Sequence, residues 1–219
     1  MIDEIIKKNI ERYEALLSKV NRPGMDNLLG FIRKSDFYMA PASTRFHLST
    51  RGGLLQHSLN VYDCLEAKSG NSTWKDVLEK AGEESIILSS LTHDLCKTYF
   101  YTEGTRNRKA YEPEKVSAAE KWQVKHDSMG DFIWESVPSY EVNDRYPLGH
   151  GQKSVIILQQ YIRLLPHEIY AILWHMGYTV PKEEWQAVRD SFELCPFALA
   201  LHEADLEASI LMEAEDGNK

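Results

Sequence analysis

The stretch that decides the fold reads Ile86-Ile87-Leu88-Ser89-Ser90-Leu91-Thr92-His93-Asp94-Leu95-Cys96-Lys97. Its first seven residues are apolar or small, which predicts a buried helix over 83–96. His93 and Asp94 then fall inside that helix, where ionisable groups are unfavourable unless they are paired or bound to a metal. Imidazole and carboxylate together suit a borderline or hard divalent cation. A single His-Asp dipeptide is weak evidence for a metal site when taken alone.

Other residues of the metal-binding type strengthen that evidence. His57, His175 and Asp205 each lie three or four residues from an apolar position of the same predicted helix, which places them on its core-facing side. His150 stands at the start of another predicted helix. One shared metal site accounts for all of them, whereas separate buried polar residues would each need a satisfied partner. The alternative is a set of core histidines with ordinary hydrogen-bond partners.

The pattern along the chain predicts a single domain over 1–219 that is all-α apart from one small β insertion. N-terminal helices occupy 1–46, and an insertion occupies 98–147. Apolar spacing and turn residues predict helices near 2–20, 25–33, 53–68, 73–80, 83–96, 148–161, 166–176, 182–191 and 196–212. The tail from Glu213 onward is expected to fray.

The insertion has a different character from the helices around it. A strand-like run at 98–101 precedes a turn-rich segment, and 121–125 is expected to pair back on it as a hairpin. Residues 98–126 carry six basic and four acidic side chains, a net charge of +2. This basic segment is either a flap that screens an anionic substrate or a solvated hairpin without consequence.

Composition restricts the function. The net charge is −8, which disfavours binding to long duplex DNA but allows a small phosphorylated substrate, because bound metal ions reverse the local field. Three dispersed cysteines are typical of a reducing compartment. The N-terminus lacks the apolar core of a signal peptide, and no stretch approaches the roughly 18 apolar residues of a membrane span. We therefore expect a cytoplasmic protein with no membrane partner.

Taken together, the motifs resemble the HD superfamily of metal-dependent phosphohydrolases. The resemblance is greatest to the HD domains of bacterial 3′→5′ exoribonucleases and of cyclic-dinucleotide phosphodiesterases. Five segments resemble family motifs in the family's order: 51–61 is similar to the GGLLEH helix, 91–97 to LHDIGK, 149–151 to GH, 172–177 to ILSHHG and 200–205 to LHxxD. The chain departs from the family at Met176, where a second histidine is usual, and at Cys96, where glycine is usual. Residues 1–50 do not resemble the oligonucleotide-binding barrel that the exoribonucleases carry ahead of these motifs.

The resemblance implies an HD-type helical bundle and a set of ligands. One metal would be held by His57, His93, Asp94 and Asp205, and Asp94 would bridge to a second metal completed by His150 and His175. If only one metal binds, His150 and His175 would instead contact the substrate. The metals would be one or two divalent ions of Mn, Fe, Co, Ni or Zn.

The implied activity is hydrolysis of a phosphate mono- or diester in a nucleotide or short oligonucleotide. The alternatives are a 3′→5′ exonuclease acting on single-stranded ends and a non-catalytic module that binds a nucleotide for signalling. Asp94 and Lys97 are the expected catalytic residues. The alternative for Lys97 is a lysine at a helix C-terminus, where the helix dipole favours a positive charge. The expected substrate-binding residues are Lys97, Lys153, Arg45, His47 and Arg51, with solvated charges as the alternative for the last four.

Overall fold

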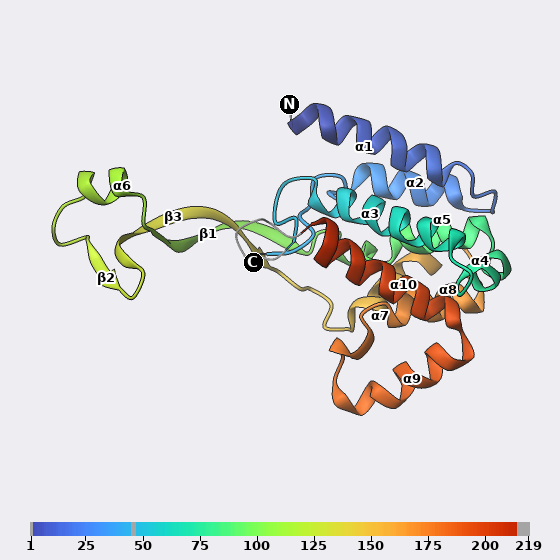
Figure 1. Cartoon of the computed structure of the whole chain (residues 1–219). Helices are drawn as coiled ribbons and strands as arrows, with labels where there is room; N and C mark the ends of the chain where they lie inside the picture. The colour runs from blue at the N-terminus through green and yellow to red at the C-terminus, as the bar shows by residue number, and fades with distance from the viewer. Residues whose placement is uncertain (1, 45–46, 214–219) are drawn as a thin grey trace.

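The computed structural model describes residues 2–44 and 47–213. It is mostly helical and carries one small antiparallel sheet (Figure 1). The α-helices of the described residues are α1 (Ile2–Leu17), α2 (Met25–Lys34), α3 (Gly53–Ala67), α4 (Lys75–Ala81), α5 (Glu83–Thr92), α6 (Pro113–Ala118), α7 (His150–Gln159), α8 (Pro166–Trp174), α9 (Trp185–Leu194) and α10 (Pro196–Glu207).

Short helical turns extend or join several of these helices. They are the 3₁₀ turns η1 (Lys68–Gly70), η2 (Leu95–Lys97), η3 (Gly177–Thr179) and η4 (Lys182–Glu184), and the π-helical turn η5 (Ala208–Met212). The helix expected over 83–96 therefore ends early, at Thr92, and a separate turn follows it. The helix expected over 196–212 is likewise divided into α10 and η5.

Two apolar clusters form the core. In the larger, α1, α2, α3, α5 and α7 meet around fully buried side chains such as Tyr13, Leu28, Leu59 and Leu88. In the smaller, α10 packs on α3, α4 and α8 through Leu65, Leu201 and neighbouring alanines. Alanines at 198, 200 and 204 allow α10 to approach α3 and α8 closely, which matters because the candidate site lies between these helices.

The sheet consists of β1 (Tyr101–Ala110), β2 (Lys125–Asp127) and β3 (Gly130–Val142) in the order β1-β3-β2. β1 pairs with β3 from Tyr101↔Val142 to Ala110↔Ile133, and β2 pairs with the start of β3. The expected pairing of 98–101 with 121–125 is wrong: the long partner of β1 is 133–142, and Lys125 alone of the second expected strand lies in β2, which pairs with β3. The two long strands make a ribbon that projects from the helical body and carries α6 and β2 at its far end (Figure 1).

The ribbon is not basic once both long strands are counted. Residues 101–142 contain six basic and eight acidic side chains, a net charge of −2. Arg108 and Lys115 form ion pairs with Glu135, and Lys109 pairs with Asp127, all within the ribbon. The +2 segment of the sequence is therefore neutralised by the strand that pairs with it, and this arrangement favours a solvated ribbon over a substrate-screening flap.

None of the helices in the described ranges is both long enough and apolar enough to cross a membrane.

Candidate metal centre

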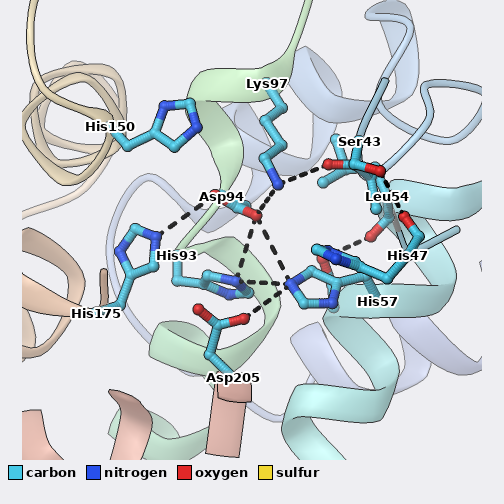
Figure 2. Close-up of polar contacts among 12 residues, drawn as sticks. Ser43, His47, Leu54, His57, His93, Asp94, Lys97, His150, His175 and Asp205 are labelled. Carbon is cyan, nitrogen blue, oxygen red and sulfur yellow. Dashed lines mark hydrogen bonds and ion pairs between the residues drawn. The ribbon is translucent and has the colours of Figure 1, made fainter. Parts of the chain in front are cut away.

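The residues predicted to bind metal come from five parts of the helical body and converge in its interior (Figure 2). His57 lies in α3, Asp205 in α10, and His175 directly follows α8, while His150 is the first residue of α7. His57 Nε2 lies 3.3 Å from His93 Nε2 and 3.2 Å from Asp205 Oδ1. Ligand atoms of His57, His93 and Asp94 all lie within 4.8 Å of one another, as do those of His93, His175 and Asp205.

The end of α5 explains how two adjacent residues reach the same point. Neighbours in a continuous helix point about 100° apart and do not face each other. His93 still has helical backbone angles, but Asp94 leaves the helix at φ −102° and ψ 22°. The change of direction brings Asp94 Oδ2 within 3.5 Å of His93 Nε2. The opposite oxygen, Oδ1, lies 3.5 Å from His175 Nε2, so Asp94 stands between the two histidines.

The outer ring nitrogens of three histidines are held by hydrogen bonds. His93 Nδ1 lies 2.8 Å from the carbonyl of Ser90, and His175 Nδ1 lies 2.7 Å from the carbonyl of Ile172. A carbonyl accepts only, so each of these Nδ1 atoms carries the proton, and Nε2 presents its lone pair to the cluster. His57 Nδ1 lies 3.1 Å from both carboxylate oxygens of Glu213. Histidine ligands of metals are oriented by outer hydrogen bonds of this kind.

The protonation states of the cluster differ between neighbours. Burial lowers the pKa of His93 to about 4, so this ring is neutral at pH 7. Burial opposes charge on His57 too, but its contacts with Asp205 and Glu213 outweigh burial and raise its pKa to about 9. Burial would raise the pKa of Asp94, yet Lys97 and the histidines hold it well below its usual range. The cluster thus contains ionised carboxylates and at least one protonated imidazole, whose proton a metal cation would displace.

His150 stands at the edge of the cluster. Its Nδ1 lies 3.6 Å from Cys96 Sγ, and ligand atoms of Asp94, Cys96 and His150 lie within 4.8 Å of one another. Burial lowers the pKa of His150, so the ring is neutral at pH 7. Burial also raises the pKa of Cys96 to about 12, which keeps the thiol protonated. His150 is therefore the available donor on this side of Asp94.

The described residues that were expected to bind substrate do not all lie at the cluster. Lys97 is buried, and its Nζ lies 2.6 Å from Asp94 Oδ2 and 2.7 Å from the carbonyl of Ala42. Lys153 is also buried and pairs with Asp144. Arg51 is exposed and pairs with Asp3, on the first turn of α1. Arg45 lies outside the described residues.

His47 is the expected substrate residue that approaches the cluster from the loop before α3. Its ring centroid lies 5.0 Å from that of His57, and its Nε2 is buried without a hydrogen bond in the described part of the chain. Burial lowers the pKa of His47, so the ring is neutral at pH 7. Its Nε2 lies 4.0 Å from Glu213 Oε2, so His47 stands beside the carboxylate that holds His57.

Comparison with known proteins adds no relative. No family model, curated protein or solved structure gives a significant match to this chain. The geometry alone therefore establishes the coarser description: a mostly helical protein with a small sheet and a buried His/Asp cluster able to hold a metal ion.

Glu213 is the main residue of the site that the sequence reasoning missed. The tail was expected to fray from this position, but the Glu213 side chain is buried between His57 and Asn60, whose amide donates to it at 2.8 Å. The wider π turn of η5 brings the chain back over α3. One signal was present: Glu213 lies eight residues after Asp205, about two helical turns further along the same face.

Proposed function

We propose that this protein is a metal-dependent phosphohydrolase of the HD type, acting on a phosphate mono- or diester of a nucleotide or short oligonucleotide. The observation that supports it best is the convergence of six residues, named from sequence spacing and motif order, in one buried cluster (Figure 2). A reading based on separate core histidines predicts no such convergence. The ordered motifs along the chain support the HD assignment, and the mostly helical fold is compatible with it.

The cluster fits a divalent cation by three features. His175 Nε2 is buried and faces Asp94 Oδ1 at 3.5 Å, beyond a well-formed hydrogen bond, so its donor atom points at the other ligands. The Nδ1–H groups of His93 and His175 are fixed outward on backbone carbonyls, which leaves the donor atoms inward. Nitrogen and carboxylate donors in this mixture suit Mn, Fe, Co, Ni or Zn.

In the proposed assignment, His57, His93, Asp94 and Asp205 hold one ion, and Asp94, His150 and His175 hold a second. Such ions lower the pKa of water and stabilise negative charge on phosphoryl oxygens. Lys97 keeps Asp94 ionised and turns its carboxylate toward the histidines, because its ammonium is held in place by the Ala42 carbonyl. This makes Lys97 a positioning residue in the proposal, in place of a direct phosphate contact.

Glu213 supports the same assignment through His57. Its carboxylate accepts from His57 Nδ1, so the neutral ring that remains after proton loss has its lone pair on Nε2, beside Asp94 and Asp205. Asn60 holds Glu213 from the other side and limits its rotation. The pair therefore selects the ring orientation that metal binding needs.

The test is metal analysis of the purified protein followed by a screen of phosphate monoesters and diesters with each of the five metals. We expect turnover with at least one metal, and loss of turnover with reduced metal content in His93→Ala and Asp94→Ala. His126→Ala is the matched control, because His126 is exposed on the ribbon. Normal turnover with normal metal content in either cluster variant would contradict the assignment. Metal and nucleotide binding without turnover would instead favour the signalling module, and release of single nucleotides from RNA ends would favour the exonuclease.

A further inference from the structure

A cavity of about 380 Å³ lies beside the metal cluster, and the proposed chemistry does not use it. It is enclosed by α2, α7 and the two segments, 98–100 and 143–148, that join the ribbon to the helices. Its volume falls within the range of about 300–1,000 Å³ that is typical of small-molecule sites. Cys96 belongs both to its wall and to the edge of the cluster, because its Sγ lies 3.6 Å from His150 Nδ1.

Aromatic rings form much of the cavity wall. Phe31 and Tyr161 stack on each other with centroids 5.1 Å apart, and Phe100 and Tyr146 line other parts of the wall. The Phe100 ring lies 5.7 Å from the ring of His150, so this aromatic surface continues up to a candidate metal ligand. Flat aromatic and apolar walls favour a planar ring that can stack, such as a heterocyclic base.

Polar groups in the same wall suit the edge of a base. Thr98 Oγ1 is buried and has no hydrogen-bond partner within residues 2–44 and 47–213. A buried hydroxyl without a partner is unfavourable, and rotation of the Thr98 side chain, which lines the cavity, would turn it toward a ligand atom that satisfies it. Asn143 and Gln160 also line the cavity, and each side-chain amide offers both a donor and an acceptor, the mixture that base edges present.

A buried cation stands between the cavity and the cluster. Lys153 lines the cavity, lies 4.8 Å from the centre of the Phe100 ring and follows His150 by three residues in α7. Its side chain is only 6% exposed and pairs with Asp144 at 2.7 Å. Asp144 also lines the cavity and neutralises this charge, so a phosphate that leads from the cavity toward His150 would take the place of the Asp144 carboxylate on Lys153.

We infer that this cavity is the base-binding subsite of a nucleotide whose phosphate ester reaches the His/Asp cluster; the second half of this statement rests on the proposed function. The cavity favours binding of a nucleotide over a phosphate ester without a base, because its aromatic walls and amide groups would contact the base and not the phosphate.

The experiment measures binding of adenosine, guanosine, cytidine and uridine to the full chain by calorimetry, with ribose 5-phosphate as the ligand that lacks a base. Ile156→Trp places a large side chain in the cavity wall, and Thr98→Val removes the unpartnered hydroxyl at constant shape. Gln160→Ala removes a lining amide, and its neighbour Gln159→Ala is the matched control outside the cavity. Circular dichroism checks that each variant folds.

We expect at least one nucleoside to bind in the absence of metal. Ile156→Trp should weaken it more than tenfold and Thr98→Val about five- to tenfold, while Gln159→Ala changes nothing. The same nucleoside should compete with hydrolysis of its own monophosphate. If no nucleoside binds, or if binding is unchanged in Ile156→Trp, the subsite is refuted whether or not the protein hydrolyses phosphate esters. Ile156-dependent binding without any hydrolysis would uphold the pocket and refute the proposed function instead.

Discussion

Metal binding to the cluster should release a proton from His57, and the affinity should therefore depend on pH. In the metal-free protein the pKa of His57 is raised to about 9 by Asp205 and Glu213, so the ring is protonated at pH 7 and must lose its proton to bind a cation. Two pKa units separate pH 7 from that value, which corresponds to about 2.7 kcal/mol, or an affinity about a hundredfold lower than that of the fully deprotonated ring. His93, with a pKa of about 4, releases no proton in this range.

The sign follows from the direction of the shift. A raised pKa means that protons compete with the metal below pH 9, so affinity rises about tenfold per pH unit between pH 6 and 8. The pKa of His175 is also raised, because contacts with Asp94 outweigh burial. Between pH 6 and 8, His57 therefore accounts for a release of about one proton per metal ion.

The assay is calorimetric titration of the metal-free protein with Mn²⁺, in two buffers of equal pH and different ionisation enthalpy. The difference in observed heat gives the number of protons released. His57→Gln should bind the metal weakly and release about one proton fewer, whereas His126→Asn on the exposed ribbon should match the unmodified protein. Mn²⁺ binding that releases no proton and is independent of pH between 6 and 8 would refute the role given to His57.

Three further predictions test the surroundings of the site. His93→Ala should lose hydrolysis and most bound metal while circular dichroism still shows a helical protein, because the two apolar clusters do not depend on the ion; loss of helix would contradict this. Glu213→Gln should weaken metal binding by about 10- to 100-fold, measured by competition with a chelator, while Glu207→Gln leaves it unchanged, since Glu207 pairs with Lys68 instead. Reversing the charges of Arg106 and Arg108 should leave KM and its salt dependence within twofold, because the ribbon is already net acidic. A clear rise in KM would instead support the hypothesis that the ribbon screens an anionic substrate.

Much of the candidate site follows from local sequence. Spacing of three and four residues from apolar positions identified His57, His175 and Asp205 as inward-facing, and the structure places all three in the buried cluster. Helical periodicity also located the main helices to within a few residues, because burial of one face is a local property of the chain.

The ribbon was harder to predict because it has almost no core. β1 reads Tyr-Thr-Glu-Gly-Thr-Arg-Asn-Arg-Lys-Ala, and nearly all of its side chains are partly or fully exposed, so the alternation that marks a half-buried strand is absent. β3 contains Pro138, which normally argues against a strand. The proline is tolerated because β3 has only β1 beside it at that position.

The sequence by itself determined which side chains face inward and which kind of ion they suit. Only the tertiary structure decided that they meet, that Asp94 leaves α5 to stand between His93 and His175, and that Lys97 is buried against it. It alone brought Glu213 onto His57 and set a cavity beside His150. The reason is physical: the face of a helix is fixed by residues three or four apart, whereas the meeting of residues up to 156 positions apart depends on how helices cross and on a turn of irregular geometry.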